Sequence, residues 1–286
     1  MTRQERYASI YSHDVVYCPP QEEGCAMLEV ALGCSWAQCR FCDFARDRFH
    51  VHSMEKIEEN LKVLGELRAD RDRIFFLGEN ALCLSTEKLL AIMEMTKRYM
   101  PKVTSFAMYA RFDDVLRKSD EELKELAQLG LFSLHIGLES GSNAVLELHH
   151  KGETAEDIEQ ALDALDRCGI HYHLTAIPGL GGAEFSREHA ARTAALISRH
   201  TPLSVWCIGL KIWPNTPLEQ MIREGSFTPL SWEDILSEER QMIAQIKPKL
   251  PFLYVDSTVL GQYTIAAMLP DQQDTVLNQI DALLNS

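Results

Sequence analysis

Short apolar runs alternate with amphipathic segments along most of this chain, and this rhythm constrains its fold more than any other feature. The runs have the length of buried strands, and the segments between them repeat apolar residues with helical spacing. We expect strands at residues 27–32, 73–77, 103–109, 131–138, 170–177 and 203–212. We expect helices at residues 53–67, 85–99, 119–129, 154–168 and 186–200, the first with Ser53 as its cap. Such alternation implies a parallel sheet with right-handed crossovers, so the sequence predicts an α/β fold, a partial (β/α)6 TIM-type barrel.

The part of the chain beyond Pro214 is less regular. A helix is expected at residues 232–245, an apolar segment lies at residues 250–254, and a final amphipathic helix is expected at residues 272–284. No low-complexity stretch or linker separates this part from the rest of the chain. We therefore interpret it as a short C-terminal helical extension that packs on the barrel and is not an independent domain.

Charge and hydropathy narrow the class of partner. The chain has 28 Lys and Arg residues against 42 Asp and Glu residues, a net charge of −14, so no nucleic-acid partner is expected. No apolar run approaches the ~20 residues that cross a bilayer, and the first residues lack the apolar core of a secretory signal. We expect a cytoplasmic protein with no membrane partner. Cysteines stay reduced there, so the eight in this chain are interpreted as metal ligands or core residues.

Three cysteines follow the first expected strand, in the segment GCSWAQCRFCDF at residues 33–44. Cys34, Cys39 and Cys42 have the spacing C-x4-C-x2-C. A structural zinc site is normally closed by four ligands, whereas three thiolates on a [4Fe–4S] cluster leave one iron open for another molecule. S-adenosyl-L-methionine (SAM) can occupy that position through its amino and carboxylate groups. We therefore predict that these cysteines hold a [4Fe–4S] cluster that binds SAM.

The alternative for this motif is a zinc site completed by a histidine, such as His50 or His52. The remaining cysteines are interpreted as structural, because two flank a PPQEEG stretch and three lie beside apolar residues. They are Cys18, Cys25, Cys83, Cys168 and Cys207.

Later segments follow the expected strands in order. The sequence reads Gly-Glu-Asn at residues 78–80, GLESGS at residues 137–142 and AIPGLGG at residues 176–182, and Lys151 lies in HHKGET. Together with the cysteine motif, these segments resemble the radical SAM superfamily, in particular the branch related to the Elp3, MiaB and NifB proteins and to oxygen-independent coproporphyrinogen dehydrogenase. The resemblance covers roughly residues 27–218. The first cysteine interval is one residue longer than the commonest family spacing, C-x3-C-x2-C.

The resemblance implies roles for matching positions. In this family the turn after the second strand meets the SAM amino group, and the acidic and hydroxyl side chains of GLESGS lie near that group or the ribose. A cation further on neutralises the SAM carboxylate, and a glycine turn passes close to adenine. The residues expected to bind SAM are therefore Phe41, Gly78, Glu79, Asn80, Glu139, Ser140, Lys151, Ile177 and Gly179. It also implies an N-terminal extension at residues 1–26, a radical SAM core barrel at residues 27–218 and a C-terminal extension at residues 219–286.

Barrel enzymes place their sites at the carboxyl ends of the strands, so residues there are candidates for substrate contact. Two histidines alternate along the fifth strand and point to the same face. The candidates are Tyr109, Arg111, His171, His173 and Lys211. Packing beneath the C-terminal extension is the alternative role for the residues that close the third and sixth strands.

The expected activity is reductive cleavage of SAM to a 5′-deoxyadenosyl radical, which abstracts a hydrogen atom from a small-molecule, tetrapyrrole or peptide substrate. An electron donor such as flavodoxin or ferredoxin is the expected partner. Two other functions remain open: a non-enzymatic haem carrier, as found among relatives of coproporphyrinogen dehydrogenase, and a zinc-stabilised scaffold.

Overall fold

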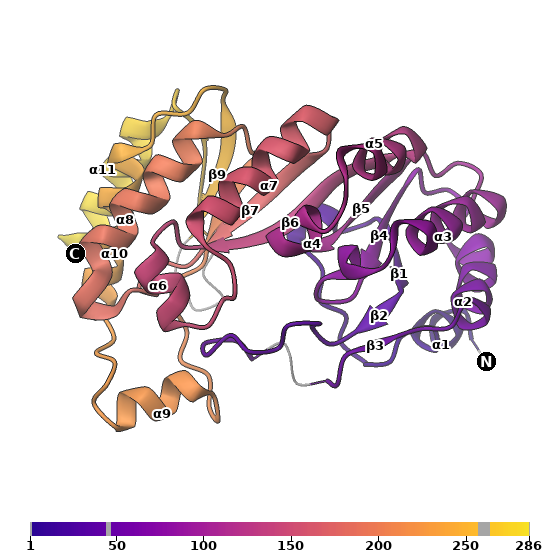
Figure 1. Cartoon of the computed structure of the whole chain (residues 1–286), viewed down its shortest axis with the longest axis horizontal. Helices are drawn as coiled ribbons and strands as arrows, with labels where there is room; N and C mark the ends of the chain where they lie inside the picture. The colour runs from indigo at the N-terminus through magenta and orange to yellow at the C-terminus, as the bar shows by residue number, and fades with distance from the viewer. Residues whose placement is uncertain (1, 44–46, 257–263, 286) are drawn as a thin grey trace. The chain divides into compact units, whose positions relative to one another are not determined.

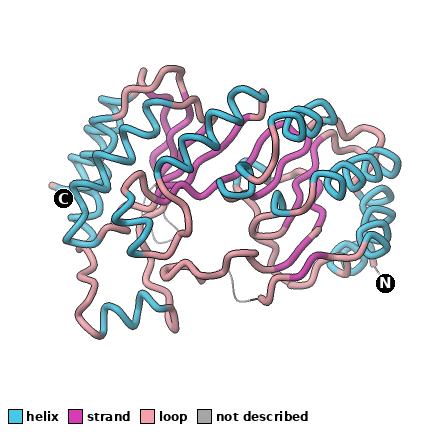
Figure 2. The backbone as a smooth tube through the Cα atoms, viewed as in Figure 1, coloured by secondary structure: helices cyan, strands magenta, loops and turns pink. Residues whose placement is uncertain are grey.

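The computed structural model describes residues 2–43, 47–256 and 264–285, and Figures 1 and 2 show its elements. The chain forms two compact units. The first consists of Met1–Ala37, Phe44–His135 and Arg167–His171, and the second of Gln38–Asp43, Ile136–Asp166 and Tyr172–Ser286. Strand β6 (Leu131–Glu139) contributes residues to both units.

The first unit contains a parallel sheet covered by helices. Its strands are, in sheet order, β1 (Ala26–Glu29), β4 (Arg73–Leu77), β5 (Ser105–Ala110) and the first part of β6. Helices α2 (Met54–Leu67), α3 (Thr86–Tyr99) and α5 (Asp120–Leu129) pack along the outer side of these strands (Figure 1). Ile74, Phe76 and Phe106 are completely buried. The smaller elements are α1 (Arg3–Ala8), α4 (Phe112–Leu116) and the 3-10 turns Pro20–Glu22 and Ala81–Cys83.

Serine caps determine where the three large helices of this unit begin. The side chain of Ser53 accepts the backbone N–H of Lys56, and Ser85 and Ser119 make the equivalent bond at the start of α3 and α5. These bonds satisfy donors that have no partner inside the helix. Helix α5 ends at Gly130, whose φ of 115° is a left-handed conformation that glycine adopts readily. The predicted helices and the Ser53 cap are confirmed.

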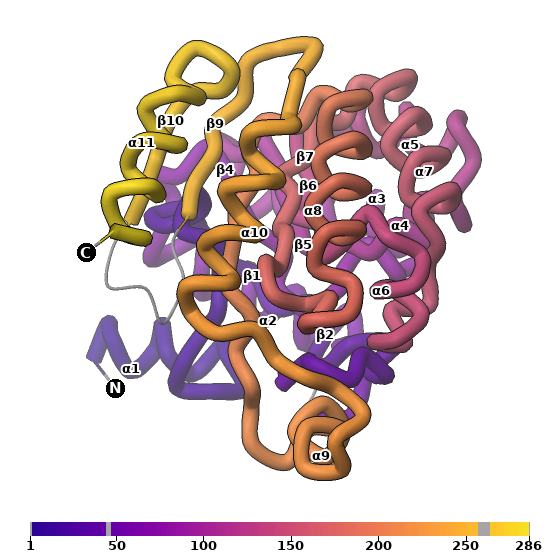
Figure 3. The backbone as a smooth tube through the Cα atoms, turned by 90° about the vertical axis from the view of Figure 1, so that its left-hand side faces the viewer, coloured from indigo at the N-terminus to yellow at the C-terminus, as the bar shows by residue number. Residues whose placement is uncertain are grey.

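The second unit continues the sheet with β6, β7 (His171–Ala176), β8 (Ser204–Cys207), β9 (Phe252–Asp256) and β10 (Ile265–Leu269). Strands β7, β8 and β9 are parallel, and β10 is antiparallel to β9. Figure 3 shows α10 (Trp232–Gln245) between α8 (Gly182–Arg199) and α11 (Gln273–Leu284), and α10 packs against both. The other helices are α6 (Asn143–Leu148), α7 (Ala155–Cys168) and α9 (Pro217–Arg223). The predicted α/β class with a mostly parallel sheet is confirmed.

The first expected strand, residues 27–32, is divided in two. After β1 the chain enters β2 (Ala31–Leu32), which pairs antiparallel with β3 (His50–Val51) at the base of the cysteine segment. Val30 lies between the two strands, and its N–H donates to Leu77 while its carbonyl accepts from His52. Gly33 follows with a φ of 69°, and an added Cβ would lie 2.5 Å from the Asp47 carbonyl oxygen, so this position requires glycine.

The C-terminal part differs from its expected form in one respect. The predicted helices at residues 232–245 and 272–284 are present, but the apolar segment at residues 250–254 belongs to β9, and β10 follows it. A short apolar run has no periodicity that separates a strand from a packed loop, so the sequence alone does not assign this segment to a strand. Within the described residues, no helix is long and apolar enough to span a membrane.

Candidate active site

The first half of the cysteine segment is held by Asn80. The amide oxygen of Asn80 accepts the backbone N–H of Ser35 at 3.0 Å, and its nitrogen donates to Ser35 Oγ at 2.7 Å and to Asp114 Oδ2 at 3.0 Å. The Asn80 side chain is buried. Sequence resemblance predicted a contact from Asn80 to SAM, and the structure shows its side chain positioning the residue after Cys34.

Arg111 and Trp36 make a second contact in the same half of the segment. The Arg111 guanidinium carbon lies 5.3 Å from the centroid of the Trp36 ring, and Arg111 Nε donates to Asp113 Oδ1 at 2.9 Å. Arg111 is only 4% exposed. The sequence placed Arg111 among the substrate contacts, and in the first unit it packs on the cysteine segment.

The second half of the cysteine segment rests on the end of α6. The backbone N–H of Arg40 donates to the His149 carbonyl at 3.0 Å, and its Nη1 donates to the Leu148 carbonyl at 2.9 Å. Arg40 Nη2 lies 2.8 Å from His150 Nε2. The backbone N–H of Cys42 donates to the carbonyl of Cys39 at 3.2 Å, which closes a turn between these two cysteines. Each half of the segment is thus fixed within its own unit.

The cysteine side chains have the state that a metal cluster requires. None of the eight cysteines forms a disulfide, and Cys34, Cys39 and Cys42 are partly exposed. Cys168 and Cys207 are buried, as expected for structural residues. The donor chemistry at residues 34–42 therefore fits an iron–sulfur cluster.

Cys25 and His52 each interact with a buried glutamate. Cys25 Sγ donates to Glu22 Oε2 at 3.2 Å, and burial raises the pKa of Cys25 to about 11. His52, one candidate for a fourth zinc ligand, places Nε2 2.8 Å from the buried Glu29 carboxylate. The raised pKa disfavours the thiolate that binds a metal, which supports the interpretation of Cys25 as a structural residue.

Glu139 and Lys151, both predicted to contact SAM, lie together in the second unit. Glu139 ends β6 with a φ of 58°, and its carbonyl accepts the N–H of Ile177 at 3.1 Å. Lys151 Nζ lies 3.4 Å from Glu139 Oε1 and 3.8 Å from Glu153 Oε2, and Lys151 is 5% exposed. An added Cβ at Gly137 would collide with the Glu139 carboxylate, so the first glycine of GLESGS leaves space for the pair of Glu139 and Lys151.

Ser140 takes part in a buried network with His189 of α8. Ser140 Oγ lies 2.7 Å from His189 Nδ1, and His189 Nε2 lies 3.1 Å from the Ile177 carbonyl oxygen. Burial lowers the pKa of His189 to about 4, so the imidazole is neutral at pH 7. Since a carbonyl can only accept, Nε2 donates to Ile177 and Nδ1 accepts from the Ser140 hydroxyl. His189 therefore links GLESGS to the glycine turn, and nothing in the sequence pattern singled it out.

The glycine turn is also held by α10. Gly179, with a φ of 89°, donates its N–H to Glu238 Oε1 at 2.6 Å. Glu238 is 2% exposed, and burial raises its pKa to about 7. Ile177 and Gly179, predicted to pass close to adenine, are thus each tied to a buried side chain from a different helix.

Glu238 makes stability depend on pH. Folding raises the pKa of the Glu238 carboxyl from 4.5 to about 7, so the folded protein binds this proton more tightly than the unfolded chain does. The stability gained from this proton is fully present below pH 4.5 and is lost as the pH rises through 7. We expect the difference in free energy of unfolding between the wild type and Glu238→Gln to change by about 3 kcal/mol over this range, in favour of the variant at high pH. Urea unfolding at several pH values measures it. A pH-independent difference would contradict the burial of this carboxyl.

His149 connects the cysteine segment to the glycine turn. Its Nε2 lies 2.7 Å from the Leu180 carbonyl oxygen, and its ring contacts the edges of Phe41 and Phe227 at centroid distances of 5.7 and 5.6 Å. Burial lowers the pKa of His149 to about 4. Phe41, the aromatic residue before Cys42, therefore packs on a neutral histidine. The adjacent pair of histidines in HHKGET is the only signal the sequence carries for this residue.

Gly78 and Glu79 lie in the first unit at the end of β4. Gly78 has a φ of 122°, and an added Cβ would approach the Ala31 backbone and side chain to 3.1 Å. Burial raises the pKa of Glu79. The tight approach to Ala31 explains the need for glycine at the first position of this turn.

Four candidate substrate residues remain, on or after strands β5, β7 and β8. Tyr109 is the last residue but one of β5, its ring centroid lies 4.9 Å from that of Phe75, and burial raises its pKa. His173 Nδ1 lies 2.8 Å from Ser204 Oγ.

His171 is the first residue of β7, so it lies at the amino end of the strand. Its side chain is exposed, and its ring centroid lies 4.8 Å from that of Phe132. Lys211 follows β8 with Nζ 3.7 Å from the Trp213 ring centroid.

Curated relatives share part of their length with this chain. An anaerobic magnesium-protoporphyrin IX monomethyl ester cyclase from Cereibacter sphaeroides is 25% identical over 204 residues, which cover 70% of this chain and 32% of the cyclase. The heme chaperone HemW from Bacillus subtilis is 26% identical over 202 residues, covering 65% of this chain and 51% of HemW. The chain thus spans about a third to a half of the length of these relatives.

Solved structures of low identity share the fold. The methyltransferase TsrM from Kitasatospora setae, solved with cobalamin and a [4Fe-4S] cluster, has a TM-score of 0.57 at 16% identity, over 71% of this chain and 40% of TsrM. Methylornithine synthase has a TM-score of 0.54 at 16% identity, over 85% of this chain and 69% of the synthase. The family model described as the Radical SAM superfamily matches residues 28–194, more than half of the chain. This chain belongs to the radical SAM superfamily, whose enzymes use a [4Fe–4S] cluster and SAM.

Proposed function

We propose that this chain binds a [4Fe–4S] cluster through Cys34, Cys39 and Cys42 and cleaves SAM reductively. With one added electron, the bound cluster and SAM supply a 5′-deoxyadenosyl radical that abstracts a hydrogen atom from substrate. The observation that carries this proposal is the cysteine segment itself. Its three thiols are outside any disulfide, and its two halves are fixed by Asn80 in one unit and by the end of α6 in the other.

The second unit would supply most of the SAM contacts. The carboxylate of Glu139 and the ammonium of Lys151 match the opposite charges of the SAM amino and carboxylate groups. His189 and Glu238 hold the turn at Ile177 and Gly179 in one conformation, so its backbone is fixed before a ligand arrives. Preorganised contacts of this kind lower the entropic cost of binding.

The substrate that fits this proposal is a small molecule, a tetrapyrrole or a peptide, and the partner is an electron donor such as flavodoxin or ferredoxin. A reactive radical has to be shielded from water, which favours a substrate held in an enclosed site. The alternative function, haem transport, is favoured by the sequence similarity to HemW.

Reduced, anaerobically reconstituted protein separates these functions. Incubation with SAM and dithionite should yield 5′-deoxyadenosine in amounts that increase with enzyme. Stoichiometric haem binding without 5′-deoxyadenosine would overturn the proposal in favour of the carrier. A colourless protein that binds zinc and no iron would overturn it in favour of a scaffold.

Asn80 offers a test of the anchored cysteine segment. In Asn80→Ala, the N–H of Ser35 and the carboxyl of Asp114 lose a buried partner, so we expect the free energy of unfolding to fall by about 2 to 4 kcal/mol. We also expect less iron per chain after reconstitution. Asn60→Ala is the matched control, because Asn60 is equally buried and donates to the Ile10 carbonyl away from the cysteines. Wild-type iron content in Asn80→Ala would contradict the anchoring role.

A further inference from the structure

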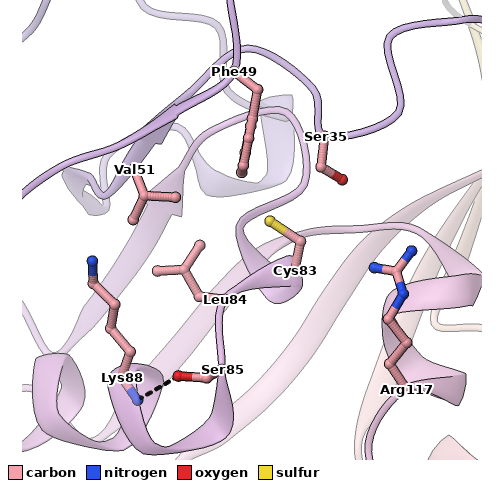
Figure 4. A pocket seen from close by; sticks show the side chains of 8 residues that line it. All are labelled: Ser35, Phe49, Val51, Cys83, Leu84, Ser85, Lys88 and Arg117. Carbon is pink, nitrogen blue, oxygen red and sulfur yellow. Dashed lines mark hydrogen bonds between the residues drawn. The ribbon is translucent and has the colours of Figure 1, made fainter.

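A hollow of about 390 Å³ opens in the first unit beside the cysteine segment (Figure 4). Ser35, the residue after Cys34, forms part of its wall. The other lining residues come from β3 and the residue before it, from the turn before α3, from α3 itself and from the residue after α4: Phe49, Val51, Cys83, Leu84, Ser85, Lys88 and Arg117. The hollow is therefore lined by the residue that directly follows Cys34, a predicted cluster ligand.

The charge of this hollow is opposite to that of the whole chain. Its lining contains two cationic side chains and no carboxylate, whereas the chain has a net charge of −14. Lys88 Nζ donates to the His52 carbonyl at 3.0 Å. Arg117 pairs with Asp114 at 2.8 Å and with Asp113, yet its side chain remains 58% exposed. An acidic partner is therefore attracted by Lys88 and by the exposed part of Arg117.

The hollow also has an apolar wall. Phe49 is 37% exposed, and Figure 4 shows its ring near Val51 and Leu84 on the side of the hollow away from Arg117. Aromatic and arginine side chains are both enriched in protein interfaces. The volume is suited to one or two side chains of a partner.

We propose that this hollow is the docking surface for a small acidic protein that carries single electrons. The inference rests on the proposed function, because reductive cleavage consumes one electron for each SAM. That electron leaves the carrier, which is oxidised by one electron, and enters the protein beside Cys34. Complementary charge around Lys88 and Arg117 steers the carrier to this face and speeds its association.

The test compares a protein reductant with a chemical one. We would measure 5′-deoxyadenosine formation with reduced flavodoxin and with dithionite in the wild type and in Lys88→Glu. The KM for flavodoxin should rise about tenfold or more in Lys88→Glu at low ionic strength, and this difference should shrink at ~0.5 M salt. The dithionite-driven rate should remain that of the wild type. Isothermal titration calorimetry should show the same loss of affinity for flavodoxin without any turnover.

Lys102→Glu is the matched control, since Lys102 is an exposed lysine of the same unit in the turn before β5, outside the hollow. It should leave the KM and the Kd for flavodoxin near their wild-type values. Equal effects of the Lys88 and Lys102 changes, or no effect of either, would overturn the docking surface. The docking surface would also be overturned if the wild type cleaved SAM with dithionite but not with reduced flavodoxin. Failure of the wild type to cleave SAM with dithionite would overturn the proposed function instead.

Discussion

Replacement of Cys34, Cys39 or Cys42 by alanine is expected to abolish SAM cleavage. Each variant retains two of the three thiolates that the proposed cluster requires, and a [4Fe–4S] cluster held by two thiolates is exposed to loss and oxidation. We expect the iron and sulfide content after anaerobic reconstitution to fall to a small fraction of the wild-type value. The yield of 5′-deoxyadenosine should fall below detection in all three variants.

Cys18→Ala is the control for these variants, because Cys18 is partly exposed and lies outside the cysteine segment. It should retain the wild-type iron content and cleavage rate. Circular dichroism and thermal unfolding of the apo proteins would establish that the three ligand variants remain folded. Full cleavage by any one of them would show that another side chain completes the ligand set.

Lys151→Met should produce the second large effect. Lys151 lies between the carboxylates of Glu139 and Glu153, and all three side chains are buried. Removal of the Lys151 ammonium takes away the positive charge between two buried carboxylates. We expect this loss to lower the free energy of unfolding by about 3 to 5 kcal/mol. We also expect the Kd for SAM to rise about tenfold or more, because a charge opposite to the SAM carboxylate is lost.

A second variant separates these two effects. Lys151→Met combined with Glu153→Gln removes one of the two like charges, so part of the lost stability should return. The affinity for SAM, measured by equilibrium dialysis of the reconstituted protein, should remain low. Recovery of SAM affinity together with stability would mean that Lys151 acts only through folding.

Much of the fold could be predicted because its signals are local. Ser53, Ser85 and Ser119 cap helices whose periodicity is visible in short windows of sequence, and the strands between them are short apolar runs. Strands β9 and β10 could not be predicted, because a strand is recognised here only by its pairing with another segment of the chain, and short windows of sequence do not show that pairing. The division of residues 27–32 into β1 and β2 depends on hydrogen bonds from Val30 to Leu77 and His52, which no local rule contains.

The candidate site could likewise be predicted only where its signals are local. The cysteine spacing and GLESGS could be recognised because each is a continuous segment. His189 and Glu238 could not, because their bonds to Ser140 and Gly179 cross 49 and 59 residues of sequence. Asn80 was placed in the correct turn, but the direction of its side chain toward Ser35 depends on the packing of the first unit.

The central claim is that three cysteines hold four irons and leave one iron for SAM. Mössbauer spectroscopy of the reconstituted protein, with and without SAM, tests it most directly. We expect SAM to change the isomer shift of one iron in four, while the other three keep the parameters of thiolate-bound sites. A spectrum that SAM leaves unchanged, or one in which all four irons are equivalent, would contradict it.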